Sequence, residues 1–369
     1  MTAPATAPVN RRAFLAKGVG AGVGVAALAA PAVAQSRRSM TIVSTWPRDY
    51  PGLGVGAQRL AARIETLTEG RLKVDYFAAG ERVGAFDAFD AVASGDAQAY
   101  IGAEGYWKGR HPGFAFFQTV PMGLTHTEMV AWANALGGQA LWDELAGRFG
   151  VKGLFCGGTG VSMGGWYNKE IRSPEDFKGL KMRVPGLGGD VFARLGASPV
   201  SLPGGQIYEN LVSGTVDAAE WIGPWADHAL KLYEAARYYY YPGLHEPGGM
   251  VSMGVNAGWW ADLPEADRAV IEALCEAETT RLLAEYDAQN GAYLDKLVQE
   301  QGVALRAFPE EVASAFTTAA EAVYAETAEH DDLAARIYRS FSAARARVGR
   351  WKSVSDAPYL ALRQTALDR

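Results

Sequence analysis

The sequence predicts an α/β fold with two lobes and a cleft between them. Residues 40–102 alternate strand-like and helix-like segments, and residues 153–221 repeat that alternation. The chain has 369 residues, whereas a single hydrophobic core rarely grows beyond about 250 to 300 residues. Two such lobes in one chain enclose a cleft, and clefts of this kind close around a ligand by hinge motion.

The first half of the chain has the strand and helix order of an α/β lobe with a largely parallel sheet. Alternating and helical periodicities predict strands at 40–46, 72–77 and 97–102, and helices at 52–68, 86–94 and 128–149. Ligands of such sheets bind beyond the carboxyl ends of the strands. We therefore expect a ligand near residues 44–47 and 104–107.

The second half repeats this order. We expect strands at 153–156, 163–168, 180–184, 198–202 and 216–221, and helices at 188–195 and 207–213. Ser173, Pro174 and the two following acids have the pattern of a capped helix start.

Two helical segments close the sequence. Residues 264–301 lack an internal proline and predict one helix of about 38 residues, or about 57 Å, which is long enough to run along both lobes. Residues 309–350 form a further amphipathic helical stretch. This stretch is either a brace on its own chain or an interaction helix of a homodimer.

The N-terminus resembles a twin-arginine export signal. Arg11 and Arg12 precede an uncharged Gly- and Ala-rich run, which ends in an A-x-A cleavage pattern at Ala34. A membrane anchor is the alternative, but about 17 weakly apolar residues are short for a span of about 20. We expect residues 1–34 to be a removable signal peptide and the mature protein to function in the periplasm.

Composition excludes several classes of protein. Without residues 1–34 the chain has 32 basic and 41 acidic residues, which argues against nucleic acid and anionic membranes as partners. The five histidines show none of the spacings of zinc, haem or redox motifs. Cys156 and Cys275 are either two buried free thiols, which we favour, or a disulfide.

Arg183 and Glu220 are the first candidates for a binding site. Arg183 ends a strand before a Pro-Gly turn, where its guanidinium could hold a carboxylate in a bidentate pair. The alternative is a surface arginine paired with Asp176 or Asp190. Glu220 ends an otherwise apolar strand, and a buried carboxylate there must be paired, bind a metal or be bonded to a backbone amide.

Four motifs resemble the solute receptors of tripartite ATP-independent periplasmic (TRAP) transporters, the DctP family, and among them the alpha-keto acid receptors. They are GGTGVSMGGWYNKEI (157–171), GLKMRVPGLGG (179–189), GGQIYENLVSGTVDAAEWIGPW (204–225) and RYYYYPG (237–243). The resemblance implies a two-lobe periplasmic binding protein fold, with a long helix spanning both lobes and an extended C-terminal helix exchanged in a homodimer. The implied parts are lobe I (35–158 and 247–285), lobe II (159–246 and 286–308) and a C-terminal helical extension (309–369).

The same resemblance assigns roles to residues. Arg183 would hold the ligand carboxylate, while Glu220 and the backbone of Trp221 would bind a cation that the ligand also chelates. Ser162 stands where these receptors have a glutamine. The candidate ligand-binding residues are Arg183, Glu220, Trp221, Ser162, Asn210, Glu104, Tyr106, Trp225 and Trp46, and the candidate metal ligands are Glu220, Trp221 and Ser162.

Charge supports a cation at this site. Arg183, Glu220 and a ligand carboxylate sum to one negative charge, and uncompensated buried charge costs several kcal/mol. One sodium ion would balance it. If Glu104 also faced the site, calcium would become the better choice.

The predicted function is a receptor without catalysis. It would bind a small 2-oxo or 2-hydroxy monocarboxylate and deliver it to the permease subunits of a TRAP transporter. The alternatives are an exported metal-assisted lyase or hydrolase with Glu220 as base, and a sensor subunit with the same cleft. We expect Arg183→Ala to abolish anion binding and to leave thermal stability largely intact.

Overall fold

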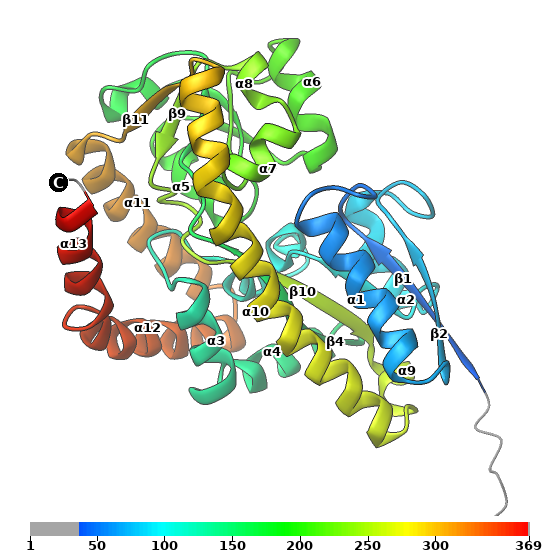
Figure 1. The fold of residues 1–369 in the computed structure, drawn as a ribbon. Coiled ribbons are helices and arrows are strands. Elements are labelled where there is room, and N and C mark those ends of the chain that lie inside the picture. The colour runs from blue at the N-terminus through cyan, green and yellow to red at the C-terminus, as the bar shows by residue number, and fades with distance from the viewer. Residues whose placement is uncertain (1–36, 368–369) are drawn as a thin grey trace, which may run out of the picture. The chain divides into compact units, whose positions relative to one another are not determined.

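The computed structural model describes residues 37–367, which form two β-sheets surrounded by helices (Figure 1). The predicted export signal, residues 1–34, lies outside the described residues. Within residues 37–367, no helix combines the length and the apolar character needed to cross a membrane.

The first sheet is mixed. Its five strands, in the order β2-β1-β3-β10-β4, are β1 (Arg38–Ser44), β2 (Leu72–Phe77), β3 (Ala99–Gly102), β4 (Val151–Gly160) and β10 (Gly249–Asn256). β1 pairs in parallel with β2 and β3, whereas β10 is antiparallel to β3 and β4. The three strands expected in the first half of the chain, β1, β2 and β3, are parallel as predicted, and β10 runs in the opposite direction where the chain re-enters the sheet.

The second sheet has six short strands in the order β11-β9-β5-β8-β6-β7. They are β5 (Gly165–Tyr167), β6 (Lys181–Arg183), β7 (Ser198–Val200), β8 (Ala218–Ala219), β9 (Tyr238–Tyr241) and β11 (Ala304–Ala307). β6 lies inside the sheet, in parallel register with β7 and β8. Arg183 is the last residue of β6, so it stands at the carboxyl edge of a central strand.

The shorter helices connect and cover the strands. They are α1 (Leu53–Leu67), α2 (Ala88–Ser94), α3 (His126–Ala135), α4 (Gly138–Gly147), α5 (Gly186–Arg194), α6 (Ile207–Val212), α7 (Pro224–Ala229), α8 (Leu232–Ala235) and α9 (Ala257–Ala261). Short 3₁₀ turns lie between them: η1 (Ala85–Asp87), η2 (Glu104–Trp107), η3 (Pro112–Phe117), η4 (Pro174–Phe177) and η5 (Gly204–Gln206). The single helix expected over 128–149 is two helices, because Gly137 adopts a left-handed conformation (φ 88°) that ends the first one.

The predicted long helix is present. α10 (Glu265–Asp295) has 31 residues and continues into a π-helical turn, η6 (Lys296–Glu300). It packs against α1 and β4 in the layer of the first sheet, and against α7 beside the second sheet (Figure 1). One continuous helix thus contacts both lobes of the fold.

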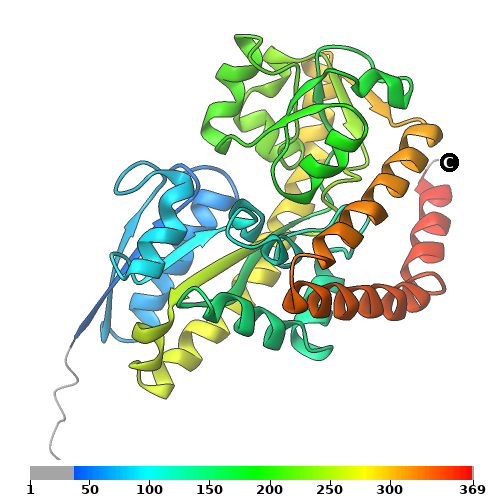
Figure 2. The same ribbon diagram turned by 180° about the vertical axis from the view of Figure 1, so that it is seen from behind.

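Three helices follow β11: α11 (Glu310–Ala328), α12 (Asp332–Lys352) and α13 (Asp356–Leu367). The continuous stretch expected over 309–350 is interrupted, because the Asp331 carboxylate accepts a hydrogen bond from the Ala334 N–H (2.7 Å) and starts a new helix. α11 packs on α5, and α12 packs across η3, α3 and α4 (Figure 2). α11 and α12 therefore brace their own chain, whereas α13 buries none of its residues.

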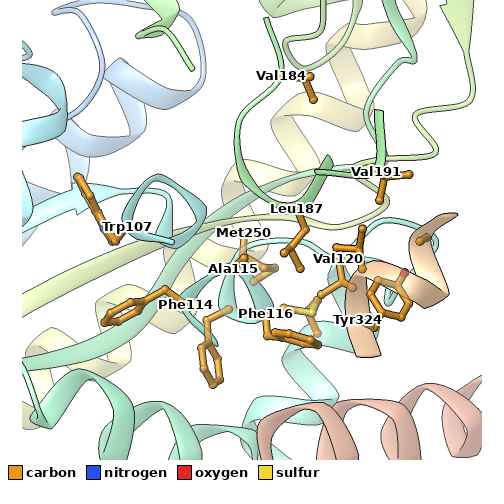
Figure 3. Packing of buried hydrophobic residues seen from close by; sticks show 14 of the residues in the cluster. Trp107, Phe114, Ala115, Phe116, Val120, Val184, Leu187, Val191, Met250 and Tyr324 are labelled. Atoms are coloured by element: carbon orange, nitrogen blue, oxygen red, sulfur yellow. The ribbon is translucent and has the colours of Figure 1, made fainter. Parts of the chain in front are cut away.

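One hydrophobic core connects the two lobes with the C-terminal brace. Figure 3 shows Phe116 and Val120, from the η3 region, close to Leu187 of α5 and Tyr324 of α11. All four side chains are buried. This packing fixes the start of α5, directly after Arg183. Elsewhere in the core, Cys156 and Cys275 are buried free thiols, as favoured from the sequence.

Candidate functional site

A cavity of about 30 Å³ lies between the two sheets. Its walls include Trp46, Ala103, Tyr106 and Gln118 from segments that follow strands of the first sheet, and Arg183, Glu220 and Trp221 from the second. Glu246, from the segment before β10, and Gly249, the first residue of β10, also line it. The cavity therefore lies at the carboxyl ends of β1, β3, β6 and β8, where such folds bind ligands.

Arg183 is almost fully buried, with 1% of its surface exposed. Its Nε donates to the Leu202 carbonyl (3.0 Å) and its Nη1 to the Glu220 carbonyl (3.1 Å). Nη1 also forms an ion pair with Glu220 Oε1. The second amino nitrogen, Nη2, is buried and has no hydrogen-bond partner among residues 37–367. Because buried donors are nearly always paired, this nitrogen is the clearest indication of a missing acceptor.

The surface alternative for Arg183 is wrong. Asp190 binds the Lys108 ammonium at 2.5 Å, and the Asp176 carboxylate accepts a hydrogen bond from the Arg172 N–H (2.8 Å). Neither acid reaches Arg183.

Glu220 is equally buried and has two charged or polar partners. Oε1 pairs with Arg183, and Oε2 lies 3.0 Å from His245 Nε2. Its backbone N–H donates to the Arg183 carbonyl (3.1 Å), which joins the ends of the two segments. The carboxylate is therefore held by side chains rather than by a backbone amide, and it faces the cavity.

Glu246 and His245 are functional candidates that sequence reasoning missed. Burial, and to a lesser degree the nearby Glu220 charge, raise the pKa of Glu246 to about 7. Ligand atoms of Glu220, His245 and Glu246 all lie within 4.8 Å of one another, a spacing that could hold a metal ion. The sequence signal that could have identified them is an acid and a histidine in a Gly- and Pro-rich turn directly before a buried apolar strand.

Trp221, Tyr106 and Trp46 line the cavity. The Arg183 guanidinium lies over the Trp221 ring, 5.2 Å from its centroid, where the ring face attracts a cation. Gly204 packs so closely against the same indole that a Cβ at this position would lie 2.3 Å from a ring carbon. The first glycine of the GGQIYENL motif therefore has a steric role in placing Trp221.

The structure does not bring Glu104, Asn210 or Trp225 to the cavity lining. Glu104 is buried in the first lobe and accepts hydrogen bonds from Tyr100 (2.6 Å) and Ser252 (2.8 Å). Asn210 donates to the Gln206 carbonyl on α6 (2.7 Å), and Trp225 packs on Tyr286 beside α10. The second acid at the cavity is thus Glu246, not Glu104.

Ser162 lies next to this site without lining the cavity. Its N–H donates to the Glu246 carbonyl (3.0 Å), and its carbonyl accepts from the Gly243 N–H (2.8 Å). Its hydroxyl is buried and has no partner in the described part of the chain.

Two side chains join the lobes around the cavity. Tyr50, which follows β1, accepts a hydrogen bond from Trp221 Nε1 (2.8 Å) and donates to the Ala226 carbonyl (2.6 Å). Lys108, which follows η2, binds Asp190 and donates to the Gly186 carbonyl (3.1 Å). Both contacts connect segments of the first sheet with segments of the second.

A family model matches most of the chain. Residues 42–331 match the DctP model, described as bacterial extracellular solute-binding protein, family 7. The chain belongs to the DctP family. The α/β fold with its two sheets matches the two-lobe fold of TRAP periplasmic solute-binding proteins.

Relatives of this DctP protein have known ligands. The monocarboxylate 2-oxoacid-binding periplasmic protein of Nostoc sp. is 37% identical over 318 residues, covering 86% of this chain and 87% of the relative. A TRAP transporter solute-binding protein from Bordetella bronchiseptica, with a TM-score of 0.88 and 33% identity over 90% of this chain and 99% of its own, is a mixed-occupancy dimer with calcium and picolinate. One from Pseudoalteromonas atlantica contains sodium and pyruvate, with a TM-score of 0.85 and 34% identity over 88% and 99% of the two chains.

Proposed function

We propose that this protein is the solute receptor of a TRAP transporter and binds a short 2-oxo or 2-hydroxy monocarboxylate together with a cation. The observation that carries the proposal is Arg183, which lines a small cavity beside Glu220 and whose buried Nη2 has no hydrogen-bond partner among residues 37–367. A guanidinium nitrogen in this position is suited to a carboxylate oxygen. The Nostoc and Pseudoalteromonas relatives, which bind a 2-oxo acid or pyruvate, support the choice of ligand class.

The residues at the cavity fit a cation. Glu220 and Glu246 supply carboxylate oxygens, and the buried Ser162 hydroxyl has no partner within the part of the chain that the structure describes. Hard cations prefer such oxygen ligands. When bound, the cation would neutralise negative charge and attract the two adjacent oxygens of a 2-oxo acid. We propose Glu220, the Trp221 backbone and Ser162 as ligands, as the family resemblance implies, and add Glu246.

The net charge of the occupied site determines which cation neutralises it. Arg183, Glu220 and a monocarboxylate leave one negative charge, which sodium compensates. With Glu246 ionised the sum is two negative charges, which calcium compensates. Glu246 thus has the role first expected of Glu104, and both ions occur in the relatives.

Closure would complete the site. We propose that residues 35–158 with 247–285, and 159–246 with 286–308, move as two lobes around the ligand. Trp46 and Trp221 would then form apolar walls that exclude water, while Arg183 and the cation orient the acid. The closed receptor would deliver its ligand to the permease subunits of the transporter.

A thermal-shift screen tests this function. Short 2-oxo, 2-hydroxy and dicarboxylic acids are added to the mature protein with sodium, calcium or a chelator. We expect pyruvate with one of the cations to raise Tm, because a ligand at 100 times its Kd stabilises the folded state by about 2.7 kcal/mol. Full affinity after exhaustive chelation would refute the cation, and no response to any acid would refute the receptor.

The enzyme alternative predicts conversion of the ligand. We expect pyruvate to be recovered unchanged after long incubation with the protein and calcium. Formation of a product that is lost in Glu220→Gln would instead favour a metal-assisted lyase or hydrolase with Glu220 as base. A sensor role would share the cleft and differ in the partner that docks on the lobes.

We also propose export by the twin-arginine pathway, because residues 1–34 contain the paired arginines, the apolar run and the cleavage pattern in order. A periplasmic location agrees with the extracellular character of the family.

We propose that a second copy of the chain covers α13 in a homodimer. Tyr359, Leu362 and Leu367 of this helix are 63%, 70% and 70% exposed, and Trp351 before it is 64% exposed. Such a row of large apolar side chains is typical of an interface, and the Bordetella relative is a dimer.

Light scattering of the mature protein tests the dimer. We expect Tyr359→Ser combined with Leu362→Ser to shift the mass from dimer to monomer, while Arg350→Ala on α12 leaves it unchanged. A monomeric wild-type protein, or a double variant that stays dimeric, would contradict the proposal.

A further inference from the structure

We propose that His245 gives the cation site a nitrogen ligand, so that the site binds a first-row transition-metal dication more tightly than calcium or sodium. His245 Nε2 would join the carboxylates of Glu220 and Glu246 around the metal, beside the Trp221 backbone and Ser162 oxygens proposed above. This inference rests on the proposed function, which already places a cation beside Glu220. It goes further by assigning a ligand and a metal class.

The spacing of two of these groups suits neighbouring metal ligands. His245 Nε2 lies 3.0 Å from Glu220 Oε2. Two ligands at right angles, each about 2.1 Å from a metal, are themselves about 3.0 Å apart. The hydrogen bond between the imidazole and the carboxylate can therefore be replaced by a shared metal ion without separating the two side chains.

The imidazole is buried and held in place. Its residue is 3% exposed, and the ring packs near Phe192 of α5, with centroids 6.3 Å apart. The segment that carries it is fixed by the Ser162 N–H to the Glu246 carbonyl and by the Met122 N–H to the Leu244 carbonyl (2.8 Å). A ligand positioned in this way loses little freedom when a metal binds.

The donor set decides the metal class. Calcium and sodium take shells of oxygen, whereas imidazole suits zinc, nickel, copper and iron. Two carboxylates and one imidazole are a mixed shell that transition-metal dications occupy well. A dication also balances Arg183, two glutamates and one ligand carboxylate, because the four side-chain and ligand charges sum to −2.

Metal titration of the mature, chelator-stripped protein tests the inference, with Co²⁺ and Ca²⁺ as probes. We expect Co²⁺ to bind wild type at least tenfold more tightly than Ca²⁺. His245→Phe should weaken Co²⁺ binding at least tenfold and change Ca²⁺ binding by less than about twofold. The visible absorption of bound Co²⁺ should change in the same variant, because that spectrum reports the nitrogen ligand.

His228→Phe, the same substitution on α7 away from the cavity, is the matched control and should behave as wild type. If His245→Phe does not fold, His245→Gln keeps a hydrogen-bond donor near Glu220 and removes the imidazole. Equal loss of Co²⁺ and Ca²⁺ affinity, or no loss of either, would overturn the proposal.

The outcome is separable from the proposed function. Pyruvate binding is measured in the presence of calcium for wild type and for His245→Phe. If neither binds any 2-oxo acid, the receptor proposal fails while the metal titration still decides the role of His245. If both bind pyruvate and Co²⁺ affinity is unchanged, only the inference about His245 fails.

Discussion

Arg183→Lys is expected to weaken binding of a short 2-oxo acid by about 10- to 100-fold, the loss of one to two charge-assisted hydrogen bonds. Lysine keeps the positive charge but lacks the planar fork that can contact Leu202, Glu220 and a ligand at once. Isothermal titration calorimetry with pyruvate measures the change. Arg172→Lys is the matched control, since Arg172 is exposed and pairs with Glu170 away from the cavity.

Arg183→Ala should remove detectable binding and also lower stability. The variant leaves the buried Glu220 carboxylate without its guanidinium partner, and breaking a buried pair in this way costs about 3–5 kcal/mol. The sequence-based expectation that stability stays intact therefore does not hold for this geometry. Retention of wild-type affinity in either variant would overturn the assignment of Arg183 to the ligand carboxylate.

Glu104→Gln is expected to stabilise the protein at pH 8 by about 2–3 kcal/mol and to remove part of the pH dependence of its stability. Burial raises the pKa of Glu104 from 4.5 to about 7. A carboxyl whose pKa is higher in the folded chain than in the unfolded chain stabilises the folded state fully below pH 4.5. This stabilisation is lost as the pH rises to about 7, because the buried group must then ionise. Glutamine is neutral at every pH and does not incur this loss.

Urea unfolding at pH 5, 6, 7 and 8 measures the effect as the difference between Glu104→Gln and wild type. The difference isolates residue 104, because Glu246, whose pKa is also raised to about 7, contributes equally to both proteins. Glu175→Gln, at an exposed glutamate paired with Lys178, is the control. A difference that does not change with pH would show that Glu104 is ionised in the folded protein.

The strand ends could be predicted from the sequence, and with them Arg183, Glu220 and Trp221. Each of these residues lies at or just after the end of an apolar segment with clear strand periodicity. Its place in the sequence therefore predicts that it lies at the carboxyl edge of the sheet. Glu104 illustrates the limit of that argument. Residues 104–107 form a 3₁₀ turn rather than extended chain, so Tyr106 lines the cavity while Glu104 is directed into the first lobe.

His245 and Glu246 could not be predicted in the same way. They lie in an irregular segment, where no period assigns a side chain to a face. Their place depends on β10, which returns to the first sheet in antiparallel register with β3 and β4. That pairing joins residues far apart in the sequence, and local patterns do not encode it.

Tyr50 and Lys108 hold the lobes together through Trp221, Ala226 and Asp190, yet neither residue lines the cavity. Part of the free energy that keeps a captured acid inside is therefore independent of which acid it is. Changes at these two positions would lengthen or shorten the residence time of every substrate alike, since affinity is tuned mostly through dissociation. Substitutions at these two positions could thus change the affinity for all ligands without changing which ligands are bound.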